Sequence, residues 1–243
     1  MRKWILAVFF ALLSVPAFAA GKLAGVDIID AQSGQRLPVY HSHGRHYVAG
    51  VPGREYSIRI RSRVYTDLLA VVSVDGVNVV TGETAGVDQG GYILRRHQRF
   101  DIRGWRKSLE QVASFYFASL DESYAARTGR PDNVGVIGVA LFRPRVQPLY
   151  EDGFGASEEP AAPGARSSEQ QADSAARLGT GHGRRLGSVV RYGQFERASE
   201  RPDEIVTIYY DSYANLVARG VIPGASPGPR AFPNGFVADP PNG

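Results

Sequence analysis

The sequence contains no cysteine among its 243 residues and only one methionine. The absence of cysteine excludes a disulfide framework, a thiolate metal site, a cysteine nucleophile and a lipid-modified cysteine. Lysine is scarce as well, since only Lys3, Lys22 and Lys107 occur among 28 basic residues. The stability of the fold must therefore come from burial of apolar groups, for which the 43% hydrophobic content is sufficient.

Long hydrophobic runs are absent beyond the N-terminus, where residues 1–19 have the three parts of a secretory signal peptide. Arg2 and Lys3 precede the apolar run Trp4–Val15, and a site of small residues ends at Ala19. We expect cleavage after Ala19 and export to the periplasm or the cell surface of a Gram-negative bacterium. Because no later stretch reaches the roughly 20 apolar residues of a membrane helix, we expect no stable membrane insertion after cleavage.

Catalytic motifs give no support for an enzyme. The sequence contains neither the His-Glu-x-x-His zinc motif nor a Ser-x-x-Lys motif. We therefore expect a protein without enzymatic activity. A hydrolase with paired carboxylates is the least favoured alternative, because it requires two acidic side chains in one cleft. The acidic candidates for such a pair are Asp88, Asp101, Glu110, Asp121, Glu122 and Asp132.

Short β-prone runs separated by turn residues predict a mainly β fold. The run Arg54–Arg61 alternates with Ile58 and Ile60 on one face, which is typical of a half-buried antiparallel strand. Asp75-Gly76 between two β-branched runs predicts a two-residue hairpin turn. We expect an antiparallel β-sandwich with one or two short helices. On this assignment Ile58→Asp should unfold the domain, whereas Arg59→Asp should be nearly silent.

Composition divides the chain into segments. After the signal peptide, residues 20–147 are expected to form the β-sandwich domain. Residues 148–178 are rich in Glu, Ala, Ser, Pro and Gly and predict a flexible linker. Residues 179–222 predict a small C-terminal β/α segment that docks on the sandwich, since so short a piece rarely holds a core alone. Residues 223–243 predict a disordered tail.

Three histidines lie close together in the sequence, at His41, His43 and His46. The first two share one face of an expected strand and the third follows the expected turn, so that three imidazoles are available for Zn²⁺ or Cu²⁺. This pattern supports a second hypothesis, a small-ligand or metal-binding periplasmic protein. A polar hairpin tip explains the same residues, and no motif for any other cofactor occurs.

A run of alternating glycines covers residues 179–183 and is followed by Arg184. Such a run resembles a loop whose backbone amides cradle an anion. The run has no preceding strand and no following helix in the predicted arrangement, so neither a dinucleotide fingerprint nor a P-loop is supported. A flexible loop that binds nothing is the alternative.

Arginines gather in two stretches of the chain, Arg54, Arg59, Arg61 and Arg63, and then Arg95, Arg96, Arg99, Arg103 and Arg106 with Lys107. These clusters suit a phosphate-rich or otherwise anionic envelope surface, and they equally suit the solvated faces of strands. The net charge of +4 is too small to imply nucleic-acid binding. Aromatic residues crowd into residues 92–124, where a buried core is a simpler explanation than an exposed platform for sugar or protein.

The stretches Leu69–Gly82, Gly91–Leu94, Ile102–Arg106, Ser123–Gly129 and Asn133–Phe142 resemble a group of uncharacterised exported proteins of GC-rich proteobacteria. This resemblance implies export, and it implies no activity and no catalytic residues. We expect a non-enzymatic exported β-sandwich, a binding or structural module of the cell envelope. Its expected partner is an envelope protein or a glycan and not a nucleic acid.

Overall fold

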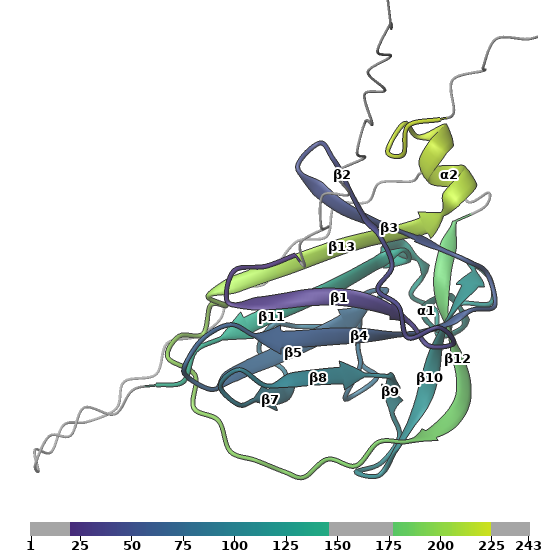
Figure 1. Cartoon of the computed structure of the whole chain (residues 1–243). Coiled ribbons are helices and arrows are strands. Elements are labelled where there is room, and N and C mark those ends of the chain that lie inside the picture. The colour runs from purple at the N-terminus through teal and green to yellow at the C-terminus, as the bar shows by residue number, and fades with distance from the viewer. Residues whose placement is uncertain (1–19, 146–176, 225–243) are drawn as a thin grey trace, which may run out of the picture.

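The computed structural model describes residues 20–145 and 177–224, and it is built almost entirely of strands (Figure 1). The predicted signal peptide and nearly all of the predicted linker and tail lie outside the described residues. Two sheets with mostly antiparallel pairing pack face to face, as the sequence predicts for a β-sandwich. No helix in the described residues is long and apolar enough to cross a membrane.

The first sheet, sheet A, has the strand order β1-β4-β10-β12, with β8 also paired to β4 and β9 to β10. Every pairing in this sheet is antiparallel. Its strands are β1 (Ala24–Asp30), β4 (Glu55–Ser62), β8 (Arg99–Ile102), β9 (Gly104–Arg106), β10 (Gln111–Ser119) and β12 (Leu178–Gly187).

The second sheet, sheet B, has the strand order β2-β3-β13-β11-β5-β6, with β7 also paired to β5. Its pairings are antiparallel except that of β13 with β3, which is parallel. Its strands are β2 (Val39–Ser42), β3 (Arg45–Gly50), β5 (Leu68–Val74), β6 (Val77–Asn78), β7 (Tyr92–Leu94), β11 (Val136–Phe142) and β13 (Glu204–Ser212).

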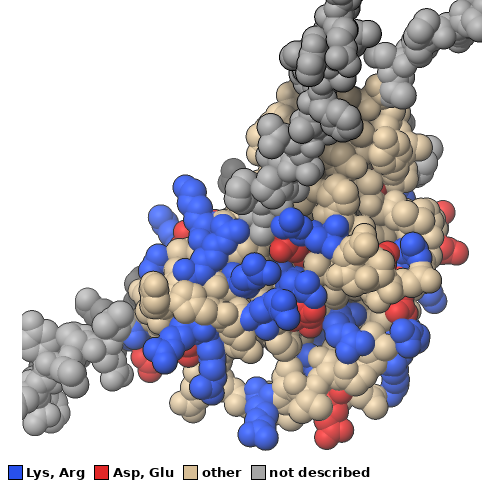
Figure 2. All heavy atoms as spheres, in the orientation of Figure 1, with Lys and Arg blue, Asp and Glu red and all other residues tan. Residues whose placement is uncertain are grey.

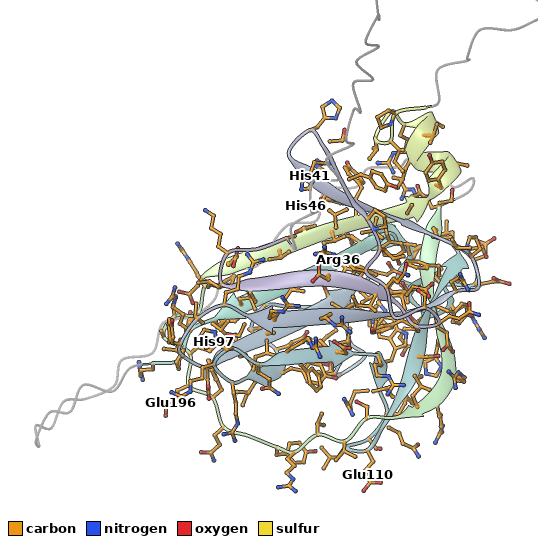
Figure 3. The ribbon with its side chains drawn as sticks, viewed as in Figure 1. Arg36, His41, His46, His97, Glu110 and Glu196 are labelled. Carbon is orange, nitrogen blue, oxygen red and sulfur yellow. The ribbon has the colours of Figure 1, made fainter. Side chains whose placement is uncertain are left out.

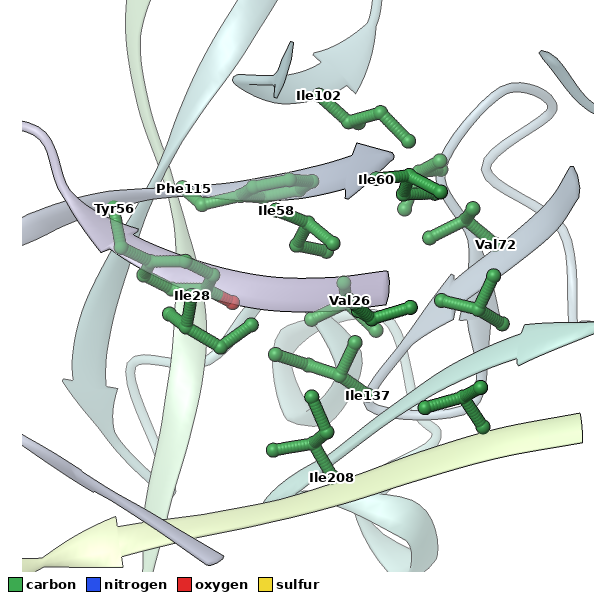
Figure 4. Packing of buried hydrophobic residues seen from close by; sticks show 14 of the residues in the cluster. Val26, Ile28, Tyr56, Ile58, Ile60, Val72, Ile102, Phe115, Ile137 and Ile208 are labelled. Carbon is green, nitrogen blue, oxygen red and sulfur yellow. The ribbon is translucent and has the colours of Figure 1, made fainter. Parts of the chain in front are cut away.

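The core lies between the two sheets (Figure 4). Val26 of β1 and Ile58 and Ile60 of β4 point inward from sheet A, and Ile137 of β11 and Ile208 of β13 belong to the same cluster from sheet B. All five side chains are fully buried. The alternation in the sequence of β4 therefore predicts its buried face correctly, because successive side chains of a strand point to opposite faces.

The predicted Asp75-Gly76 turn is confirmed between β5 and β6. Asp75 has a φ of 52° and Gly76 a φ of 72°. A type I′ turn requires positive φ at both central residues, and aspartate and glycine tolerate it better than most residues.

The C-terminal segment enters both sheets. Strand β12 adds to the edge of sheet A beside β10, and β13 lies inside sheet B between β3 and β11. The segment is thus an integral part of the sandwich, because its second strand lies between two other strands of sheet B.

The helices are short, as expected. Helix α1 (Tyr124–Arg127) begins after Ser123, whose hydroxyl accepts a hydrogen bond from the Ala126 amide, and a 3-10 turn, η1, covers Pro131–Asn133. Helix α2 (Tyr213–Ala218) begins in the same way after Ser212. Serine is a favoured residue at this position because its oxygen satisfies a free amide of the first helical turn.

Candidate functional site

The three predicted metal-binding histidines do not come together. His41 of β2 and His46 of β3 are direct cross-strand partners with ring centroids 4.8 Å apart, and both project from the β2–β3 hairpin (Figure 3). His43 lies in the turn with a φ of 49°, and its Nδ1 is 2.9 Å from the Ser42 hydroxyl. The described residues contain no group of three His, Asp or Glu side chains able to hold a metal. The strand geometry assumed for His43 is wrong, because the turn begins after Ser42.

The predicted glycine loop is also wrong, because residues 179–183 belong to strand β12. Tyr116 of β10 is the cross-strand partner of Gly181, and a Cβ at Gly181 would collide with the ring of Tyr116. These glycines therefore let an aromatic ring lie flat on the sheet, and they do not form a loop that cradles an anion. Arg184, expected to assist such a loop, is bound to Glu55.

The crowded aromatic residues are mostly core, as the sequence favours. Phe115 and Phe117 share one face of β10 and are fully buried. Tyr56 stacks on both, with centroid distances of 5.4 and 4.4 Å. Trp105 is buried as well and meets Phe115 edge to face. An exposed aromatic docking platform is therefore not formed by these four residues.

A buried polar network, missed by the sequence analysis, joins the two sheets. The Asp75 carboxylate accepts hydrogen bonds from the Tyr210 hydroxyl at 2.5 Å, the Gly135 amide at 2.9 Å and the Thr180 amide at 2.7 Å. The Thr180 hydroxyl in turn lies 2.6 Å from the Tyr210 hydroxyl and 2.7 Å from that of Tyr56. Asp75 lies in the β5–β6 turn of sheet B and Tyr210 in β13 of the same sheet, whereas Thr180 and Tyr56 belong to sheet A.

The pKa values of this network reflect its burial. Burial raises the pKa of the Asp75 carboxyl to about 6, and the hydrogen bonds that it accepts oppose this shift. Burial, with the Asp75 charge next in importance, raises the pKa of Tyr210 and of Tyr56 well above the ordinary phenol value. Because the network is enclosed in the core, we assign it to the cohesion of the sandwich and not to ligand chemistry.

The two arginine stretches become neighbours on the outer face of sheet A, because β4 pairs with β8. Arg61 stands directly opposite Arg99 in this pairing, and both residues are exposed. Figure 2 shows Lys and Arg gathered across the part of the molecule where β1, β4 and β8 lie in Figure 1, with fewer acidic groups between them. We call the outer surface of β1, β4 and β8 the basic face.

Acidic side chains on and beside the basic face are each held by an arginine. The ion pairs join Asp27 with Arg36, Asp30 with Arg54, Glu55 with Arg184 and Asp101 with Arg59. Arg61 and Arg99 have no acidic partner of this kind within residues 20–145 and 177–224. The face therefore carries positive charge that its own carboxylates do not neutralise.

A pocket of about 210 Å³ opens on the basic face. Two ion pairs line it: Arg184 donates to Glu55 through two nitrogens at 2.9 and 3.0 Å, and Arg59 donates to Asp101 through two nitrogens at 2.8 Å. Arg103 also lines the pocket, and within the described residues its side chain forms one hydrogen bond, a long contact of 3.5 Å to the Gly187 carbonyl.

Three carboxylates line the pocket, Asp30, Glu55 and Asp101, and the last two are held in the charged form by the two ion pairs. The hydrogen bonds from Arg184 lower the pKa of Glu55, and those from Arg59 lower the pKa of Asp101. A hydrolase that uses a carboxyl pair needs one carboxyl with a raised pKa to serve as the acid. The electrostatics of this pocket suit ligand binding better than acid catalysis. Among the predicted acidic candidates, Asp101 is the one that lines this pocket.

The motif of a serine nucleophile elbow, Gly-x-Ser-x-Gly, was expected to be absent, but one such string occurs at residues 224–228. A nucleophile elbow needs a strand before the serine and a helix after it. Here the string follows helix α2 and the turn at Gly220, and Ser226 lies outside the described residues. The string therefore lacks the preceding strand that the mechanism requires.

Comparison with known proteins adds no relative. No family model matches the chain, and neither the curated proteins nor the solved structures provide a significant match. The features that bear on the function of this protein are therefore the geometry of the basic face and of its pocket.

Proposed function

We propose that this protein is an exported, non-enzymatic binding module of the bacterial cell envelope whose basic face binds an anionic glycan. The observation that carries the proposal is the cross-strand pair of Arg61 and Arg99, which is exposed and has no acidic partner among the described residues. Like charges placed directly opposite each other destabilise a sheet. A bound polyanion removes this repulsion, so the pair is better explained by a ligand than by stability.

The extent of the face supports a polymer as the ligand. Successive residues of a strand on one face lie about 6.6 Å apart, twice the rise of roughly 3.3 Å per residue. Arg59, Arg61 and Arg99 therefore present guanidinium groups along and across two strands. A chain of linked acidic sugars offers negative charges repeatedly along its length, and an arginine fork pairs well with a carboxylate or a phosphate.

Three observations support the other parts of the proposal. The N-terminal sequence is typical of an exported protein, and an anionic glycan is a major component of bacterial envelopes. The Asp101 and Glu55 carboxylates are both locked to arginines, which favours binding over acid catalysis. The β2–β3 hairpin brings only two histidines together, so a glycan is favoured over a metal as the ligand.

The experiment is a binding titration of the purified protein with polygalacturonate, a carboxylated glycan, and with dextran, a neutral one. We expect saturable binding to polygalacturonate and none to dextran. Raising the salt from 0.05 M to 0.5 M should weaken the binding strongly, because the Debye length shortens several-fold over roughly this range. A single-stranded oligonucleotide of equal charge serves as a third ligand.

Two results would contradict the proposal. Equal binding to dextran and polygalacturonate means that the charge of the face is not what recognises the glycan. Tighter binding to the oligonucleotide than to polygalacturonate, at equal salt, assigns the face to nucleic acid instead.

A further inference from the structure

We infer that the pocket on the basic face binds one acidic sugar unit, a pyranose ring that carries a carboxylate. This inference rests on the proposed function and names the unit of the glycan that gives selectivity. Among the charged groups that line the pocket, Arg103 is available for the carboxylate of the sugar, and Glu55 and Asp101 can accept hydrogen bonds from its hydroxyl groups.

Arg103 is the group that binds the carboxylate. It lines the pocket between the two ion pairs, and it forms no ion pair of its own in the described part of the chain. Its positive charge lowers the pKa of both Glu55 and Asp101, so it lies close enough to influence each of them. A guanidinium has five N–H donors, and the single long contact to the Gly187 carbonyl leaves most of them free for a ligand.

Glu55 and Asp101 are the groups that accept the hydroxyls. Each oxygen of a carboxylate offers about two acceptor positions. The two oxygens of Asp101 accept one hydrogen bond each from Arg59, and Glu55 Oε2 accepts one from Arg184, so that acceptor capacity remains on both side chains. Glu55 Oε1 already accepts from Arg184 and from the Ser114 hydroxyl. This arrangement keeps the carboxylates fixed while a sugar donates to them.

The size of the pocket suits a single sugar. At about 210 Å³ it is smaller than the roughly 300–1,000 Å³ of pockets that enclose drug-sized ligands. A phosphate ion alone would use Arg103 and meet the negative charges of Glu55 and Asp101, which repel it. A neutral sugar would use the two carboxylates and leave Arg103 unpaired. Only a ligand with both a carboxylate and several hydroxyls uses every group.

The test is calorimetric titration of the full protein with galacturonate and with galactose, its neutral counterpart. We expect galacturonate to bind at least tenfold more tightly. Arg103→Gln should lose at least tenfold in galacturonate affinity and retain the weak affinity for galactose. Arg127→Gln removes an exposed arginine outside the pocket and outside both arginine stretches, and it should leave both affinities unchanged.

A second variant blocks the pocket without changing its charge. Ala31 is exposed and lines the pocket, so Ala31→Trp should abolish galacturonate binding while thermal unfolding shows an intact fold. Unchanged galacturonate affinity in Ala31→Trp or in Arg103→Gln overturns the inference. If polygalacturonate binds but free galacturonate does not, the pocket is not a subsite and the proposed function stands. If neither ligand binds, the proposed function fails as well.

Discussion

The hydroxyl of Tyr210 donates a hydrogen bond of 2.5 Å to Oδ1 of Asp75 in the buried interior. Both residues are buried; Asp75 lies in the β5–β6 turn and Tyr210 in β13 of sheet B. The second oxygen of Asp75 accepts from the Thr180 amide of sheet A, so one carboxylate connects the two layers. No arginine or lysine pairs with Asp75 among the ion pairs of the described residues. Within that part of the chain, hydrogen bonds balance its negative charge.

Asp75 should make the stability depend on pH. Its folded pKa of about 6 lies above the ordinary value of 3.8, so the folded state holds the proton more tightly than the unfolded state does. The contribution of the Asp75 proton to the stability of the fold is therefore complete below about pH 4 and is lost as the pH rises through 6. Between pH 4 and pH 7 we expect the contribution of Asp75 to fall by on the order of 2 kcal/mol. The measurement is the free energy of unfolding in urea for the wild type minus that for Asp75→Asn.

This difference isolates Asp75, because Glu55 and Asp101 titrate equally in both proteins. In the Asp75→Asn variant the side-chain oxygen can still accept the Tyr210 bond, but the new amide nitrogen would face the Thr180 amide. The variant should therefore be less stable at every pH. A difference that is flat between pH 4 and pH 7, or that grows with pH, would contradict the raised pKa.

The two tyrosines of the network should differ in importance. Tyr210→Phe removes the donor to the buried carboxylate and should cost about 2 kcal/mol or more, because bonds to charged groups contribute about 1.5–3 kcal/mol. Tyr56→Phe removes a neutral bond to Thr180 and should cost about 1 kcal/mol. Guanidinium unfolding of both variants measures the two values. Equal losses would mean that the charge of Asp75 does not dominate the network.

Strand β4 offers a test of the fold with an internal control. Ile58→Asp places a charge in the fully buried core and should prevent folding at ordinary temperature. Arg61→Asp, three residues away on the outer face, should leave the melting temperature within a few degrees of the wild type. Circular dichroism on heating distinguishes the two. Similar melting temperatures would mean that the faces of β4 are assigned wrongly.

The contacts of the neighbouring Arg59 lead us to expect that Arg59→Asp is destabilising, whereas the sequence alone predicts a nearly silent change. It lies between Asp27 and Asp101 in the register of the sheet and donates two hydrogen bonds to Asp101. Arg59→Asp would place three carboxylates side by side across three strands. We expect a loss of roughly 1–2 kcal/mol, since like charges directly opposite destabilise a sheet and a bidentate pair is lost. If urea unfolding of Arg59→Asp matched that of the wild type, the row of Asp27, Arg59 and Asp101 across the three strands would contribute nothing to stability.

Substitution by alanine should affect stability differently at two glycines of sheet A. At Gly104 a new Cβ would collide with the backbone of Ala113 and Ser114, which cannot move without breaking the β9–β10 pairing. We expect Gly104→Ala to cost about 1–3 kcal/mol, the usual range for overpacking. At Gly187 nothing lies within 4 Å of the new atom, and Gly187→Ala should be within about 0.5 kcal/mol of the wild type. Differential scanning calorimetry compares the melting temperatures of the two variants. Equal melting temperatures would contradict the close approach of Gly104 to the backbone of β10.

Local features were predictable from the sequence, and long-range ones were not. The buried face of β4 and the Asp75-Gly76 turn follow from residue type and spacing within a few positions. The pairing of β4 with β8, which creates the basic face, joins residues about 40 positions apart and has no local signal. The glycines of β12 suggest a loop because glycine is disfavoured in strands. Tyr116, the ring that requires them, is distant in the sequence.

The central claim is tested most directly by the affinity of the Arg61→Gln/Arg99→Gln double variant for polygalacturonate. The control is Arg127→Gln/Arg191→Gln, which removes two exposed arginines outside β4 and β8. Each arginine near an anionic surface contributes about 1 kcal/mol, so the first variant should bind roughly 10- to 30-fold more weakly and the control should lose far less. An equal loss in both double variants, or no loss in Arg61→Gln/Arg99→Gln, would contradict glycan binding by the basic face.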